Sequence, residues 1–230
     1  MSERPCRHLL LLLFGALLLL LPLSLSAQDG GKTYVKFRTN KGSFTIELYD
    51  DTPLHKAAVL EHVRRGDYDG LLFHRVIKNF MVQMGGAVEG DSKGREMKLE
   101  ELSEKRIPKE IVYPKHFHKR GAVAAARLGD DENPSQESDG IQFYVCVGQF
   151  FLQKELEPYR SDSIAPMTDE VMHAYMTEGG VPHLDGRYTV FGEVVRGMNT
   201  ILKIQDTPTG GEDRPLKPVY VKSVKVVRRP

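Results

Sequence analysis

The chain has 230 residues, with 32 Lys and Arg against 31 Asp and Glu, and a formal net charge of +1 at neutral pH. A protein that binds the phosphate backbone of a nucleic acid needs a basic face, and the sequence contains no cluster of lysine and arginine interleaved with aromatic residues. The composition therefore argues against a nucleic-acid partner.

The first 27 residues predict a signal peptide. Arg4 and Arg7 precede a leucine-rich run from Leu9 to Leu25, and the small residues Ser26 and Ala27 close it. This segment would direct the chain out of the cytoplasm and be cleaved after Ala27, and in a Gram-negative cell the periplasm is the expected destination. The alternative is a membrane anchor that is not cleaved, because a run of about 17 apolar residues is at the short edge of what crosses a bilayer.

Residues 28–230 are expected to form one domain with a helical insertion at about 149–182. Without the first 27 residues, basic and acidic residues fall from 32 and 31 to 30 each, so this part of the chain is neutral. Its one cysteine, Cys146, has no partner for an internal disulfide and is expected to be a buried small apolar residue. We expect a monomer, with no stable insertion into a membrane once the signal peptide is cleaved.

Alternation of apolar and polar residues predicts a β-hairpin over 35–48, with its turn at 40–42. Thr52 and Pro53 then predict the start of a helix that Gly66 ends. Further strands and a second short helix, at 198–205, are expected in the rest of the chain, the strands at 71–77, 80–84, 121–126, 141–147, 188–195 and 219–227. This pattern is typical of a mainly β fold, an antiparallel barrel or sandwich with two short helices.

Two segments depart from this pattern. Residues 90–118 are rich in charge and are expected to form a loop with a little helix. In the insertion, Thr168 predicts the N-cap of a helix that two glycines, at 179 and 180, bring to an end. The apolar residues of this helix form one stripe, Val171, Met172, Tyr175 and Met176. The stripe either packs on the barrel or stays in part available to hold a client protein.

The apolar run FHRVIKNFMVQMGG, at 73–86, contains an arginine, Arg75, and a glutamine, Gln83. In a strand, alternate side chains share a face, so Met81 and Gln83 are expected to point to the same side. A buried arginine costs several kcal/mol unless it is paired. Arg75 is therefore expected either to bond a carboxylate or to lie at the edge of a cavity.

This run resembles the signature of the cyclophilins, the peptidyl-prolyl cis/trans isomerases. Three later segments resemble cyclophilin segments in the same order: GAVAAARLG (121–129), GIQFYVCV (140–147) and HLDGRYTVFGEVVRGM (183–198). The similarity extends from about Val35 to Val227. It implies a closed antiparallel barrel of about eight strands capped by two short helices. It also implies a rotamase that accelerates rotation about X-Pro bonds in folding proteins, without a cofactor.

By the matched motifs, the resemblance implies catalytic roles for Arg75, which assists the rotation, and for Gln83, which holds a backbone group of the substrate. The substrate-binding residues that it implies are Phe80, Met81, Ala126, Arg127, Gln142, Tyr144, His183, Leu184 and Tyr188. Three of them depart from common members of the family, with Tyr144 in place of Phe, His183 in place of Trp and Tyr188 in place of His. These departures bear on the selectivity of the pocket more than on its activity.

Rotation about an X-Pro bond needs neither a nucleophile nor a metal. In the twisted amide the prolyl nitrogen regains a lone pair, and a guanidinium that donates a hydrogen bond to it stabilises that state. The spacing of His116 and His118 could place both on one face of a strand, but no third metal ligand stands at a recognisable spacing and no H-E-x-x-H motif occurs. The remaining alternative is a holding chaperone that binds proline segments with little or no isomerase activity.

Overall fold

The structure is a computed structural model, and it describes residues 31–85 and 100–230. The predicted signal peptide lies outside the described residues, as does part of the charged segment at 90–118. In the described part of that segment, residues 100–104 are helical and residues 105–118 are mainly loop, as expected. None of the helices in the described ranges has the length and apolar character that a membrane crossing requires.

Eight strands in the described residues form one antiparallel sheet with the order β3-β4-β6-β5-β7-β2-β1-β8. Strands β1 (Thr33–Thr39) and β2 (Gly42–Leu48) form the expected hairpin. The other strands also confirm the predicted positions: β3 (Arg75–Ile77), β4 (Met81–Met84), β5 (Ala122–Ala125), β6 (Phe143–Cys146), β7 (Val190–Arg196) and β8 (Val221–Val227).

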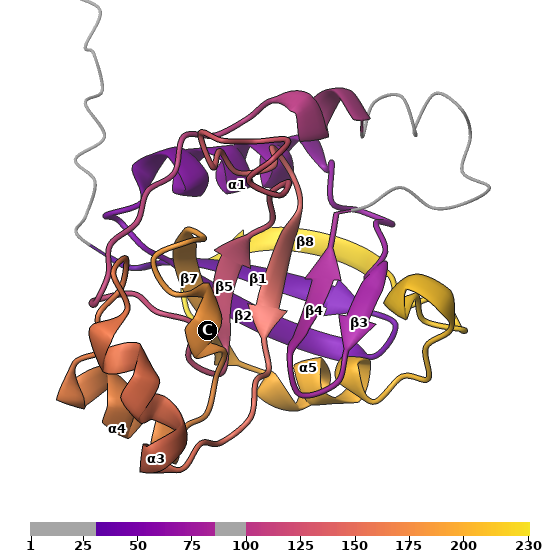
Figure 1. The fold of residues 1–230 in the computed structure, drawn as a ribbon. Coiled ribbons are helices and arrows are strands. Elements are labelled where there is room, and N and C mark those ends of the chain that lie inside the picture. Colours follow the sequence, from indigo (N-terminus) through magenta and orange to yellow (C-terminus); the bar gives the residue numbers. More distant parts are fainter. Residues whose placement is uncertain (1–30, 86–99) are drawn as a thin grey trace, which may run out of the picture. The chain divides into compact units, whose positions relative to one another are not determined.

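The sheet curls strongly (Figure 1) but does not close into the expected barrel, and this prediction is corrected. The edge strands β3 and β8 do not pair with each other; the segments just before them meet instead. Leu72 forms an isolated bridge with Tyr220, and the Phe73 N–H donates to the Val219 carbonyl at 2.9 Å. After Phe73 the chain turns to pair with β4, so the short β3 does not continue along β8.

One face of the curled sheet encloses the main core. Alternate strand residues pack there with side chains of α1 (Pro53–Arg65) and α5 (Met198–Gln205). Phe37 and Phe44 stack at its centre, with ring centroids 4.9 Å apart. Figure 1 shows α1 and α5 on opposite sides of the strands, so the two helices cover the core from two sides.

Helix α1 begins and ends where the sequence predicts. Pro53 is its first residue, and Gly66 ends it at φ 70°, a left-handed conformation that glycine adopts at little cost. Thr52 stands at the N-cap position, but its side chain makes no capping bond. The Glu110 carboxylate takes that role, since it accepts the backbone N–H groups of the helix's second and third residues at 3.0 Å each.

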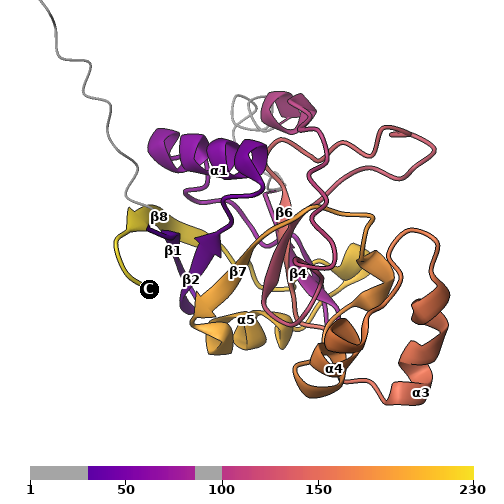
Figure 2. The same cartoon turned by 90° about the vertical axis from the view of Figure 1, so that its left-hand side faces the viewer.

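Residues 149–182 form a small cluster of their own. It contains α3 (Gln153–Leu156), the short turn η1 (Glu157–Ser161) and α4 (Asp169–Thr177), and Figures 1 and 2 both show α3 and α4 side by side. The Thr168 hydroxyl caps α4, as predicted, by accepting the Val171 N–H at 3.3 Å. Most of the apolar stripe of α4 is buried inside this cluster, and Met176 is its exposed member.

Candidate active site

The second face of the sheet is built from small side chains near the middle of the molecule. In β5, Val123 and Ala125 point into the main core, whereas Ala122 and Ala124 point to the other face, followed by Ala126. Alanine side chains leave room beside the larger residues of the neighbouring strands. A cavity of about 200 Å³ opens on this face, and we call it the pocket. Its lining residues are Arg75, Phe80, Met81, Gln83, Ala126, Arg127, Tyr144, Leu184 and Tyr188.

These nine lining residues are all among the eleven predicted site residues. The other two do not line the pocket but contact residues that do. Gln142 accepts a hydrogen bond from the Gln83 side chain at 3.1 Å, and the His183 ring stacks on the Phe80 ring with centroids 5.6 Å apart. The structure therefore brings all of the predicted site residues to one place.

Strand register explains how three of these residues come together. Arg75 stands opposite Gln83 in the β3–β4 pair, and Gln83 stands opposite Tyr144 in the β4–β6 pair. Met81 and Gln83 both line the pocket, as their spacing predicts, whereas the residues between and after them are buried in the main core. An arginine, a glutamine and a tyrosine thus form one row across three strands.

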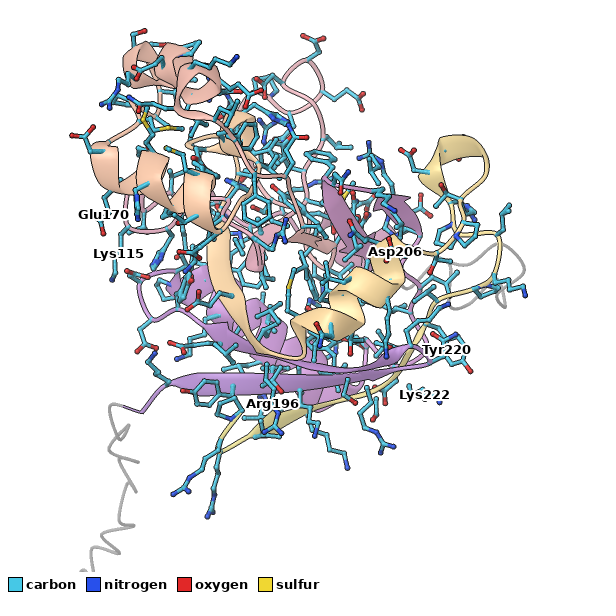
Figure 3. All side chains as sticks on the ribbon, turned by 90° about the horizontal axis from the view of Figure 1, so that it is seen from below. Lys115, Glu170, Arg196, Asp206, Tyr220 and Lys222 are labelled. Atoms are coloured by element: carbon cyan, nitrogen blue, oxygen red, sulfur yellow. The ribbon has the colours of Figure 1, made fainter. Side chains whose placement is uncertain are left out.

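The turn between β3 and β4 is held by the end of α5. Asn79 has φ 58°, a left-handed conformation that asparagine tolerates better than most residues. Its backbone N–H donates to the Gln205 side chain at 3.0 Å, and Lys78 pairs with Asp206 at 3.2 Å. Figure 3 shows Asp206 at the end of α5. These contacts fix the turn that leads into Phe80 on the pocket wall.

Arg75 lies at the rim of the pocket with 45% of its side chain exposed. Its Nε donates to Asp213 Oδ2 at 3.4 Å, and Asp213, at the end of the short turn η3 (Gly211–Asp213), is also exposed. This bond uses Nε, so the terminal nitrogens of the guanidinium can serve a ligand. The neighbouring His74 stays neutral near pH 7, because burial and, to a lesser extent, Arg214 lower its pKa to about 4.

A chain of hydrogen bonds orients Gln83. Asp139 accepts the Gln142 side-chain N–H at 3.1 Å, and its other oxygen accepts the backbone N–H of Gln142 at 2.8 Å. Because the amide nitrogen of Gln142 faces this carboxylate, its amide oxygen faces Gln83 and accepts from the nitrogen of Gln83. That arrangement leaves the carbonyl oxygen of Gln83 available to a ligand.

The opposite wall is aromatic. The Tyr144 and Tyr188 rings meet edge to face, with centroids 6.0 Å apart, and the Arg127 guanidinium lies 4.5 Å from the centre of the Tyr188 ring. Tyr144 Oη lies 3.0 Å from His118 Nε2. His118 thus supports the pocket, a role that sequence reasoning missed, because it considered this residue only as a metal ligand together with His116.

His116 lies elsewhere, with its Nε2 2.7 Å from Asp51 Oδ1 and its ring stacked on Tyr49. Within residues 31–85 and 100–230, no three His, Cys, Asp or Glu side chains are grouped so that they could hold a metal ion. His116 and Asp51 border a larger cavity of about 490 Å³. Most of its charged residues pair with one another, Lys119 with Glu193 at 3.0 Å for example, and none of the predicted site residues lines it. The smaller pocket is therefore the candidate site.

Comparison with known proteins agrees with this geometry. The sequence matches the family model described as "Cyclophilin type peptidyl-prolyl cis-trans isomerase/CLD" over residues 34–226, which is most of the chain. The chain belongs to this family. It is accordingly a peptidyl-prolyl cis-trans isomerase, of a family that acts on proline-containing protein substrates.

Two curated bacterial relatives of this cyclophilin carry the name "Putative peptidyl-prolyl cis-trans isomerase". The Staphylococcus saprophyticus protein is 32% identical over 200 residues, which cover 86% of this chain and 94% of the relative. The Staphylococcus aureus (strain COL) protein is 30% identical over 202 residues, which cover 85% and 92%. Among solved structures, a cyclophilin type isomerase of Cryptosporidium parvum is similar with a TM-score of 0.59 and 21% identity, covering 86% of this chain and 99% of that one. The fold is thus cyclophilin-like.

Proposed function

We propose that this cyclophilin rotates X-Pro bonds in the pocket between Arg75 and Tyr144, with the prolyl ring seated against Phe80, Met81 and Leu184. The observation that carries the proposal is the row formed by Arg75, Gln83 and Tyr144. The guanidinium, with its available donors, lies beside a cavity of about 200 Å³, and the apolar side chains of that cavity can receive a prolyl ring.

In this proposal, Arg75, the apolar side chains of the pocket and Gln83 each lower part of the barrier to rotation. Rotation breaks amide resonance, a barrier of about 18–20 kcal/mol. Bringing a step of about a hundred seconds into the millisecond range is a factor of about 10⁵ and requires about 7 kcal/mol, and one charge-assisted hydrogen bond from Arg75 contributes about 1.5–3 kcal/mol. The apolar side chains of the pocket, which favour the less polar twisted amide, and Gln83, which anchors the backbone on one side of the bond, supply the rest.

The substrates that we propose are exported proteins that are still folding. This part rests on the predicted signal peptide, residues 1–27, which would release residues 28–230 as the active domain in the periplasm. Sequencing the N-terminus of the protein purified from its own cells tests it, with Gln28 as the expected first residue. An N-terminus at Met1 in a protein of the cytoplasmic fraction would contradict export.

The test of the mechanism is peptide isomerisation by residues 28–230 with and without Arg75. Arg75→Ala is expected to lower kcat/KM by about a hundredfold or more while the fold, followed by circular dichroism, stays intact. Arg196→Ala is the matched control, since Arg196 lies at the end of β7 (Figure 3) and donates to the Pro230 carbonyl rather than into the pocket. Turnover like that of the wild type in folded Arg75→Ala would refute the mechanism. A wild type that binds proline peptides without turning them would indicate the holding chaperone.

A further inference from the structure

A chain of hydrogen bonds connects the aromatic wall of the pocket to helix α4 through four buried residues. Tyr144 Oη lies 3.0 Å from His118 Nε2, and His118 Nδ1 lies 2.8 Å from Asp185 Oδ1. The Tyr175 hydroxyl donates to Asp185 Oδ2 at 2.6 Å. Each of the four residues is at most 5% exposed. We call Tyr144, His118, Asp185 and Tyr175 the Tyr144 network.

The proton positions in this network follow from its carboxylate. Asp185 accepts the backbone N–H of His118 at 2.8 Å as well as the ring nitrogen Nδ1, and an ionised carboxylate can only accept. Nδ1 of His118 therefore carries a proton, and in the neutral ring Nε2 is then an acceptor. The Tyr144 hydroxyl must then donate to Nε2, so each member fixes the orientation of the next.

We propose that His118 and Tyr175 are positioning residues that fix the depth of the proline pocket, so that it accepts the five-membered ring of proline and excludes a larger ring. The inference rests on the proposed function, because it takes the pocket as the seat of the prolyl ring. Tyr175 touches no substrate in this proposal; it acts through Asp185 and His118 on the position of the Tyr144 ring.

The packing holds the Tyr144 ring at both ends. Its backbone lies in β6, which is paired on one side with β4 and on the other with β5, and its hydroxyl is held by His118. The His118 ring also packs edge to face against Tyr188, with centroids 6.4 Å apart, so one histidine supports two lining residues. A phenylalanine at position 144 would lack the hydroxyl and would be free of this restraint.

The far end of the network is anchored outside the sheet. Tyr175 is fully buried in the cluster of residues 149–182, and its ring packs edge to face against Phe151 of this cluster and against Phe117, which lies outside it in the sequence. Because this cluster is separate from the main core, it can hold the hydroxyl of Tyr175 in place independently of the strands. The predicted insertion thereby becomes a support of the pocket wall.

If the Tyr144 ring is fixed in position, the pocket should discriminate against a substrate ring with one extra methylene. Apolar contacts of this kind change the ratio of kcat/KM values by about 10- to 200-fold. The test therefore compares an X-Pro peptide with the same peptide carrying pipecolic acid, the six-membered homologue of proline. The wild type is expected to prefer the proline peptide by about tenfold or more in kcat/KM.

Tyr175→Phe removes the last hydroxyl of the network and is expected to lower this preference about threefold or more, chiefly through the KM of the two peptides. Tyr144→Phe is expected to lower it similarly, and adding Tyr175→Phe to Tyr144→Phe should change nothing further, because the connection is already broken. The matched control is Tyr113→Phe, since the Tyr113 hydroxyl donates to the Pro166 carbonyl at 3.1 Å, outside the network.

An unchanged preference in folded Tyr175→Phe and Tyr144→Phe would overturn the inference. Equal losses on both peptides would also overturn it, because they would show general support of the fold and no control of pocket depth. If Tyr175→Phe does not fold, Tyr144→Phe alone decides, since it leaves α4 intact. Retention of turnover by Arg75→Ala would refute the proposed function and this inference together, whereas an inactive Arg75→Ala with unchanged preferences would refute this inference alone.

Discussion

The two arginines that line the pocket have opposite surroundings. The side chain of Arg127 is 6% exposed, donates to Asp130 at 2.6 Å and to the Arg187 carbonyl at 3.0 Å, and lies over the Tyr188 ring. Arg75 is 45% exposed, and its pair with Asp213 is long. Arg127 is therefore held by the protein, whereas most of the donors of Arg75 remain for a ligand.

This difference shows why a positive charge beside a pocket does not by itself identify a catalytic group. A hydrogen bond accelerates a reaction only if it is stronger in the transition state than before it. Arg127 already donates to Asp130 and to the Arg187 carbonyl in the resting protein. Breaking one of these bonds would cost about as much free energy as a new bond to a substrate would supply. In the mechanism that we propose, the guanidinium of Arg75 loses little when it donates to the twisted amide, because its one bond among the described residues is the long contact with Asp213.

The strongest test of the contrast is Arg75→Lys, which keeps the charge but loses the planar set of donors. If the geometry of the guanidinium matters, kcat/KM should fall by roughly 10- to 100-fold, in line with the loss of one charge-assisted hydrogen bond in the transition state. The measurement is kcat/KM for isomerisation of an X-Pro peptide, after subtraction of the uncatalysed rate. A lysine variant as active as the wild type would mean that a point charge at the rim is sufficient.

Next in size is the effect of Gln83→Leu, which removes the proposed backbone anchor next to Arg75. One hydrogen bond contributes about 0.5–1.5 kcal/mol, so kcat/KM should fall by roughly three- to tenfold, with the change mainly in KM. Gln153→Leu is a suitable control. Gln153 lies in α3, and its side chain donates to the exposed Glu157 at 2.9 Å rather than into the pocket. A change confined to kcat would assign Gln83 to the rotation itself.

Arg127→Met should separate stability from activity. It keeps the apolar stem against Tyr188 but leaves the Arg187 carbonyl without its donor, a loss of about 1–2 kcal/mol of unfolding free energy. The thermal midpoint should fall by about 2–4 °C for each kcal/mol, while kcat/KM falls only about twofold. If Arg127→Met instead lost more activity than Arg75→Lys while its thermal midpoint stayed unchanged, Arg127 and not Arg75 would be the catalytic arginine.

The elements that could be predicted from the sequence are those fixed by short-range patterns. Alternation and a glycine turn define the β1–β2 hairpin, and Thr168 caps α4 as its neighbours suggest. The open edge of the sheet could not be predicted in this way. It depends on contacts such as the backbone hydrogen bond between Phe73 and Val219, which are far apart in the chain and have no shared pattern.

The same division holds for the pocket. Its lining residues lie in four motifs that the sequence displays, and strand register brings them together. The Tyr144 network could not be predicted, because His118 is the last residue of the charged segment at 90–118 and Tyr175 lies in the predicted insertion. Asp185, which joins them, lies in the quoted segment at 183–198, but the sequence does not indicate that its carboxylate would face inward.

The smallest expected effect belongs to Asp213→Ala, which removes the partner of Arg75. An exposed ion pair contributes roughly 0–1 kcal/mol, so kcat/KM should stay within about twofold of the wild type. A slight gain is expected at low salt, because the carboxylate then no longer competes with the substrate for the guanidinium. The gain should disappear near 1 M salt, where the Debye length is about 3 Å and the exposed pair is screened in both proteins. A loss of about tenfold or more would mean that Asp213 orients Arg75 for catalysis. Arg75 would then be held by the protein as Arg127 is, and the availability of its donors could no longer explain its role.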